Sequence, residues 1–177
     1  MLIQEMTEGE CRAMLAGNHV ARLACARNNQ PYIVPIHVDL DHEYLYGYAT
    51  LGQKIEWMRQ NPLVCLEIDE LMPDRQWASV VVIGHYEELP HTPEYEESRS
   101  VAERLFQRRP VWWEPASVPL IGHERRTPIV FRIRIDRMTG RRGAPDTVKT
   151  VHVRNNASET RMPRWLAQVL RRVVGRP

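Results

Sequence analysis

The sequence predicts a mainly β fold, a six-stranded antiparallel β-barrel with flanking helices. Six strand-like segments are joined by short, hairpin-like links, and helical patterns occur only in two crossovers and at the two ends of the chain. These features favour a mainly antiparallel sheet over repeated βαβ units. Closing such a sheet into a barrel would remove its exposed edges. A chain of 177 residues is long enough for one good core, so a single domain is the default.

The first half of the chain is expected to hold one helix and three strands. Residues 7–10 read Thr-Glu-Gly-Glu, a capping box that starts a short helix ending near Gly17. Asn28 and Asn29 form a turn that makes a hairpin of the first two strands. Proline cannot donate to a β-ladder, so Pro35 indicates an edge or a bulge in the second strand. The three strands are expected at 19–27, 31–40 and 44–49.

The second half alternates strands with helices. A short helix over 55–60 should stop before Pro62, because the residue that precedes a proline disfavours helical backbone. A second helix starts with Thr92 as its cap and continues to about residue 108. The longest strand contains residues 80–83, which are apolar on both faces and should be deeply buried or lie at a subunit contact. The strands are expected at 63–70, 76–89 and 129–136.

Two regions follow from this order of elements. Residues 1–137 form the barrel domain, and residues 138–177 form a C-terminal extension that begins with polar, irregular sequence. The extension ends in an arginine-rich helix over 163–174, whose apolar stripe is expected to pack on the barrel or on a partner subunit. Contact of its arginines with nucleic acid or a membrane surface is the less favoured alternative.

Residues 50–54, Thr-Leu-Gly-Gln-Lys, have the composition of an anion site. They stand at the start of the helix over 55–60, where unpaired N–H groups and the helix dipole favour negative charge. Lys54 adds a full charge and is one of only two lysines in the sequence. A phosphate is therefore the expected ligand of this segment, and an ordinary exposed helix start is the alternative.

Composition argues against several other classes of protein. Three cysteines without a C-x-x-C pair are expected to be buried thiols, and seven histidines without an H-E-x-x-H motif suggest no metal. A net charge of +2 is too small to indicate nucleic acid. No apolar run approaches the roughly 20 residues of a spanning helix, and the first residues lack a signal-peptide pattern. A cytoplasmic protein without membrane contact is expected.

Three segments, taken in order, resemble the pyridoxamine 5′-phosphate oxidase-like, FMN-binding split-barrel superfamily. They are residues 24–36, residues 44–70 with the pattern Gly-x-Lys-x-Glu-x-x-x-x-Asn-Pro, and residues 77–84, Trp-Ala-Ser-Val-Val-Val-x-Gly. Within the superfamily, the sequence is most similar to the branch that includes nitroimidazole-resistance proteins. The resemblance covers roughly residues 5–137.

The resemblance implies a homodimer that holds two FMN molecules at its subunit interface. It implies that one strand segment lies along the isoalloxazine ring, that the anion site binds the FMN phosphate, and that the start of the long strand lies beside the ribityl chain and the phosphate. His37, which follows the first segment, is expected to be a core or rim histidine rather than a catalytic one. The implied cofactor-binding residues are Ile33, Val34, Pro35 and Ile36, then Thr50, Leu51, Gly52, Gln53 and Lys54, and then Trp77, Ser79 and Val80.

Trp112 and Trp113 stand next to each other in a proline-bounded loop. They are expected either to pack over the barrel mouth or to contact flavin or substrate from the second subunit. The C-terminal third lacks the arginine and histidine pattern with which pyridoxamine phosphate oxidases bind their substrate phosphate, so that reaction is not implied. No catalytic residue is assigned.

Two classes of function fit the sequence. In the first, the protein is an FMN-dependent oxidoreductase that acts on a small molecule with an electron donor such as NADH or NADPH. The cofactor then carries the redox chemistry, and the chain needs no acid–base pair. In the second, the protein is a carrier or sensor that binds a flavin, a deazaflavin or haem without turnover. Rapid reduction of bound flavin by NADH or NADPH would distinguish them.

Overall fold

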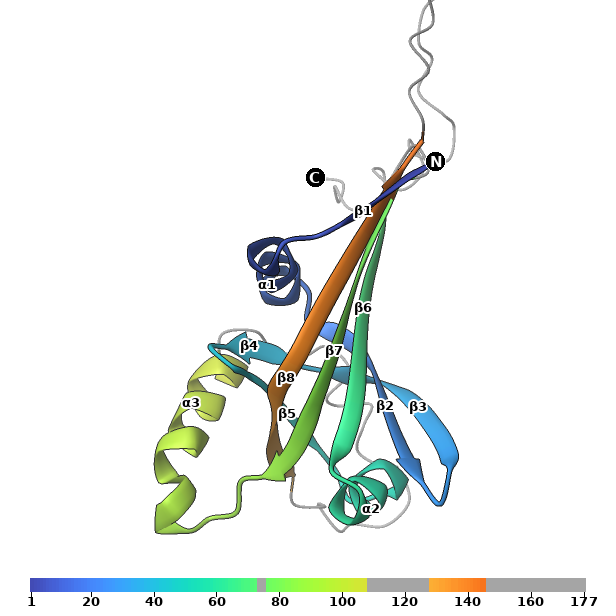
Figure 1. Cartoon of the computed structure of the whole chain (residues 1–177). Helices are drawn as coiled ribbons and strands as arrows, with labels where there is room; N and C mark the ends of the chain where they lie inside the picture. The colour runs from blue at the N-terminus through green and yellow to red at the C-terminus, as the bar shows by residue number, and fades with distance from the viewer. Residues whose placement is uncertain (73–75, 108–127, 146–177) are drawn as a thin grey trace, which may run out of the picture. The chain divides into compact units, whose positions relative to one another are not determined.

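The computed structural model describes residues 1–72, 76–107 and 128–145, all within one compact unit, Met1–Asp146. Strands and helices follow one another along this part of the chain as shown in Figure 1. The helices are α1 (Glu8–Gly17), α2 (Gln53–Gln60), the 3-10 helix η2 (Pro93–Tyr95) and α3 (Glu96–Gln107). The strands are β1 (Leu2–Glu5), β2 (Val20–Arg27), β3 (Gln30–His37), β4 (Asp39–Asp41), β5 (Tyr44–Ala49), β6 (Leu63–Met72), β7 (Gln76–Glu88) and β8 (Ile129–Ala144).

The described strands form one antiparallel sheet. Its order is β3-β2-β6-β7-β8-β5-β4, and β1 pairs with the far end of β8. The prediction of a mainly antiparallel β fold with flanking helices is therefore confirmed. The count of six strands is wrong, because the described part of the chain has eight. The ladder of these eight strands also does not close into a barrel, since no pairing joins β3 to β4.

Pairing partners distant in the sequence explain the two additional strands. β1 pairs with Arg141–Ala144 of β8, and its four side chains are all exposed, so no apolar alternation marks it as a strand. The single strand expected over 31–40 is instead two strands that meet at Val38. His37 pairs with Val20 of β2, whereas Asp39 pairs with Tyr46 of β5. The chain thus changes partner within two residues and begins a new strand.

Local signals at turns and helix starts are mostly confirmed. Thr7 and Glu10 form the capping box of α1, with each side chain accepting from the other residue's backbone N–H. Asn28 and Asn29 both have positive φ, 51° and 62°, as a two-residue type I′ hairpin requires. Thr92 makes no side-chain cap, and the chain after it begins with η2 before α3. No helix among the described residues is both long and apolar enough to cross a membrane.

The main core lies under the centre of the sheet. Leu23, Leu66 and Phe131 come from three different strands and are essentially inaccessible to solvent. Val80 and Val82 are buried in the same cluster, whereas Val81 and Ile83 point to the other face of β7 and are half-buried. The apolar run over 80–83 is therefore deeply buried on one face only. A second, smaller cluster joins α3 to Tyr46 of β5.

β8 is longer than the sequence suggests. It continues to Ala144, seven residues beyond the expected boundary at 137, and pairs with β7 along nearly its whole length. Its last residues are mostly exposed, which explains why the sequence there is polar. Residues 146–177, with the helix expected over 163–174, lie outside the described part of the chain.

Candidate functional site

The predicted anion site forms the start of α2. The helix begins at Gln53 with Gly52 as its N-cap, and no side chain caps it. The Gly52 backbone is extended, and a Cβ added there would meet no heavy atom within 4 Å. The space beside the Gly52 backbone is therefore open, and the unpaired N–H groups and the dipole of a helix start favour an anion there. This geometry fits the phosphate cradle that the sequence predicts.

Lys54 is a half-buried cation with no counter-ion among the described residues. No acidic side chain in the described part of the chain forms an ion pair or a hydrogen bond with it, and burial lowers the pKa of its ammonium group. Its electrostatic neighbour is Cys25 of β2, a buried thiol whose pKa burial raises despite the nearby ammonium. A partly desolvated charge without a partner is unfavourable, so this position favours an anionic ligand.

The structure brings β3 close to this helix. Cys25, the neighbour of Lys54, pairs with Tyr32 of β3, and the rings of Tyr32 and Trp57 of α2 lie 5.6 Å apart. β3 is also the last strand of the ladder, as Pro35 indicates. Along β3, Ile33 and Pro35 are exposed, Val34 is half-buried and Ile36 is buried. Ile33 and Pro35 therefore form an open apolar face of β3, on the side of the strand opposite to the Tyr32–Trp57 contact.

The third group of predicted residues, Trp77, Ser79 and Val80, lies far from the start of α2 within the same chain. Cys25, the neighbour of Lys54, pairs with Val64 of β6, and Val64 pairs with Gly84 of β7. Gly84 is therefore the residue of β7 that lies across the sheet from Cys25, at the same height along the strands as Lys54. Trp77 lies seven residues from Gly84, about 23 Å along the strand. Within one chain, the structure does not bring this group to the cradle.

The side chains of this third group already have protein partners. The indole of Trp77 donates to the sulfur of Met1, at 3.4 Å, and its ring fills the space above Gly143. The Ser79 hydroxyl donates to Glu67, at 3.2 Å, and the Val80 side chain is fully buried. Trp112 and Trp113 lie outside the described residues.

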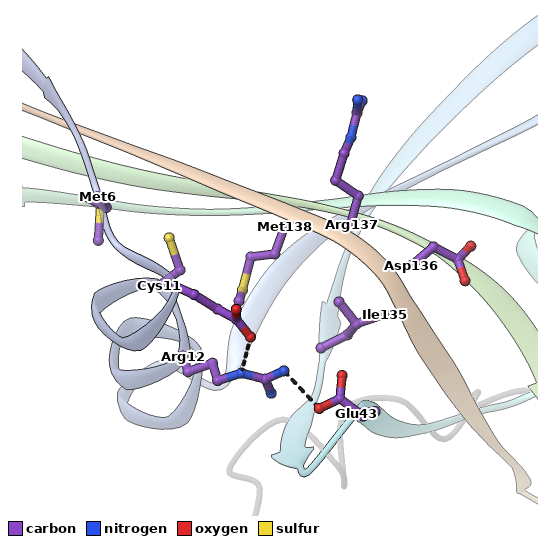
Figure 2. A pocket seen from close by; sticks show the side chains of 9 residues that line it. Met6, Cys11, Arg12, Glu43, Ile135, Asp136, Arg137 and Met138 are labelled. Carbon is purple, nitrogen blue, oxygen red and sulfur yellow. Dashed lines mark hydrogen bonds and ion pairs between the residues drawn. The ribbon is translucent and has the colours of Figure 1, made fainter.

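A hollow lies between α1 and β8 (Figure 2), and α1 is far from α2 in Figure 1. It has a volume of about 220 Å³, and its walls include Met6, Cys11, Arg12 and Met138. Arg12 is already bound by Glu8, at 2.9 Å, and by Glu43, at 2.8 Å, as the dashed lines in Figure 2 show. Its positive charge is therefore compensated by the protein, and the hollow does not need an anionic ligand.

The structure also forms a polar cluster that sequence reasoning missed. His19, His37 and Asp39 offer ligand atoms that all lie within 4.8 Å of one another. Burial alone would raise the pKa of Asp39, but contacts with His37 and His19 outweigh this and lower it. The two histidines are 18 residues apart in the sequence, and only the pairing of β2 with β3 brings them together. No local motif could have indicated the cluster.

The open antiparallel sheet, with an uncapped helix start beside its β3 edge, is the architecture of a split-barrel protein. A sequence model of the pyridoxamine 5′-phosphate oxidase family matches residues 7–142. An uncharacterised protein of Rhizobium meliloti (strain 1021) is 43% identical over 144 residues, which are 80% of this chain and 95% of the relative. The chain belongs to the pyridoxamine 5′-phosphate oxidase family.

Two solved structures have the same fold. An FAD-binding protein from Mesorhizobium loti is 38% identical, with a TM-score of 0.67 over 80% of this chain and 97% of that one. A candidate 5-nitroimidazole antibiotic resistance protein from Bacteroides thetaiotaomicron is 16% identical, with a TM-score of 0.59 over 80% of this chain and 89% of that one. The resemblance to the superfamily that includes nitroimidazole-resistance proteins is confirmed.

Proposed function

We propose that this protein binds a flavin, FMN, at the start of α2 and uses it as an oxidoreductase that acts on a small molecule. The observation that carries the proposal is Lys54, a half-buried ammonium group at an uncapped helix start that has no counter-ion in the described part of the chain. A flavin phosphate would supply the missing negative charge. The Mesorhizobium loti relative, described as an FAD-binding protein, gives independent support for a flavin.

The residues of the chain fit such a ligand in distinct roles. Gly52 leaves room for a phosphate, and the N–H groups that follow it are oriented to donate. Ile33 and Pro35 provide an exposed apolar strand against which a planar ring system can lie. A flavin supplies the redox chemistry when it is bound, and the chain supplies position and a dry surface.

The first expected result concerns the identity of the cofactor. The purified protein should be yellow and should release FMN on heating, because the cradle is a single compact phosphate site and the sequence has no Gly-x-Gly-x-x-Gly turn for a dinucleotide. Chromatography and mass spectrometry of the released compound identify it. Release of FAD would contradict FMN while keeping the flavin site, and release of haem would contradict the whole proposal.

Turnover is tested separately from binding. Stopped-flow mixing of the flavin-loaded protein with NADH or NADPH should bleach the flavin band quickly, and a small-molecule acceptor should restore it. Reduction no faster than that of free flavin would contradict the oxidoreductase part of the proposal. It would instead favour a carrier or sensor that binds flavin without turnover.

The second expected result is a homodimer with flavin at the subunit interface. Trp77 and Ser79 lie about 17–23 Å from the level of Lys54 on β7, so only a second chain can bring such residues to the cradle. Val81 and Ile83, half-buried on the outer face of β7, would be covered by the same contact. Light scattering on the flavin-loaded protein should give twice the chain mass. A monomer at micromolar concentration with flavin bound would rule out the dimer.

A further inference from the structure

His19, His37 and Asp39 form a compact, largely buried group at the corner where the chain leaves β3 for β4. His19 precedes β2, His37 ends β3 and Asp39 begins β4. The Val38 N–H donates to the carbonyl oxygen of His19, at 2.9 Å, which ties the backbone segments of the three residues together. His37 and Asp39 are 8% and 7% exposed, and the side chain of His19 is 18% exposed. The three side chains are therefore held by a rigid frame, with a small opening at His19.

Hydrogen bonds within the group do not satisfy all of its polar atoms. Nε2 of His37 lies 3.0 Å from one oxygen of Asp39, in hydrogen-bond geometry. Nδ1 of His19 lies 2.8 Å from the other oxygen, but the two atoms are not aligned as a hydrogen bond. Nε2 of His19 also has no hydrogen-bond partner in the described part of the chain. A buried polar atom left unpaired costs about 1–3 kcal/mol, so a further ligand would be stabilising here.

Close approach without hydrogen-bond alignment is expected of atoms that share a metal ion. In a tetrahedral site, two ligand atoms about 2.1 Å from the ion are about 3.4 Å apart. Because all three ligand atoms already lie within 4.8 Å of one another, a combined shift of at most about 1.4 Å in the two imidazoles brings them into this range. Two imidazoles and one carboxylate are a ligand set typical of zinc and of non-haem ferrous iron.

We propose that His19, His37 and Asp39 bind one divalent transition-metal ion of the zinc and ferrous class. Within the described residues, no fourth histidine, cysteine or acidic side chain joins the group. Three protein ligands leave at least one coordination position for water or a small molecule, as in catalytic rather than structural zinc sites. The site is separate from the flavin cradle and does not depend on it.

Equilibrium dialysis of the full-length, EDTA-treated protein against zinc, with metal measured by mass spectrometry, tests the proposal. We expect one zinc ion per chain, and no displacement by excess magnesium, which prefers oxygen ligands. X-ray absorption of the zinc-loaded protein should show nitrogen and oxygen ligands with imidazole scattering and no sulfur at about 2.3 Å. Less than stoichiometric zinc, or zinc bound by sulfur, would overturn the proposal.

Substitutions of the proposed ligands test whether these residues bind the ion. Asp39→Asn keeps the shape of the side chain but removes its charge, and His37→Gln removes one imidazole, so each should weaken zinc binding about tenfold or more. His91→Gln is the matched control, because His91 is exposed, lies 2.8 Å from Arg99 and is not part of the cluster. Circular dichroism confirms that each variant is folded. Unchanged zinc affinity in both folded variants would contradict the assignment, and the absorption spectrum decides the ligands if a variant does not fold.

Discussion

Replacing Lys54 with alanine is expected to weaken FMN binding about tenfold to hundredfold, or about 1.5–3 kcal/mol, the usual loss for a charge-assisted hydrogen bond. The fold should survive, because alanine favours helix and no described residue forms an ion pair with the half-buried ammonium group. Flavin fluorescence during titration of the apoprotein gives the affinity. Urea unfolding of the same sample gives the free energy of unfolding, which should not fall.

Riboflavin provides the sharpest control for this prediction, because it has the ring and ribityl chain of FMN but no phosphate. Lys54→Ala should leave riboflavin affinity unchanged, so the difference between the two ligands isolates the contact between Lys54 and the phosphate. Arg104→Ala, at an exposed position of α3, removes one positive charge elsewhere and should change neither affinity. Equal FMN affinity in Lys54→Ala and the wild type would place the phosphate elsewhere.

Phe131→Ala is expected to lower the free energy of unfolding by about 3–5 kcal/mol, the range for removing a large aromatic side chain from a core. Phe131 on β8 is inaccessible to solvent, and its ring lies 5.4 Å from that of Tyr86. A Cβ added at Gly47 would come within 2.8 Å of the Phe131 ring, so the strand next to it is packed closely against this side chain. Alanine would leave a cavity that such a rigid environment fills poorly.

The only other phenylalanine, Phe106, is the matched control for this substitution. It lies half-buried on α3 and meets the edge of Tyr48, with ring centres 4.9 Å apart. Phe106→Ala should cost no more than about half as much, because less apolar surface leaves water there. Urea unfolding of the two variants under one set of conditions compares them. Equal losses would show that Phe131 is not central to the core.

Elements with their own local signal could be predicted from the sequence. The capping box at Thr7 and Glu10, the positive-φ pair at Asn28 and Asn29, and the apolar run within β7 each act within a few residues. β1 has no such signal, because its side chains are all exposed and only backbone pairing with β8 makes it a strand. The break at Val38 likewise depends on a change of pairing partner from β2 to β5.

The same distinction applies to the candidate sites. Residues 50–54 are contiguous, so a helix start, a glycine and a lysine could be recognised together. A role for β3 in the site could be expected only by resemblance. The distance of Trp77 from residues 50–54 could not be predicted, because it follows from the register between β6 and β7. His19 and Asp39 become neighbours through two separate ladders, so periodicity within either strand says nothing about their approach.

The pairing of β1 with the end of β8 determines how this region would respond to a pulling force. Leu2 lies opposite Ala144, and the two strands run antiparallel from that pair inward to Glu5 and Arg141. A tension applied between Leu2 and Ala144 would therefore load the outermost hydrogen bonds first and peel β1 away one pair at a time. The long β7–β8 ladder would resist a pull along its strands with many bonds together. The β1–β8 pairing would thus break one hydrogen bond after another at low force, whereas the β7–β8 ladder, loaded in shear, would withstand a higher force.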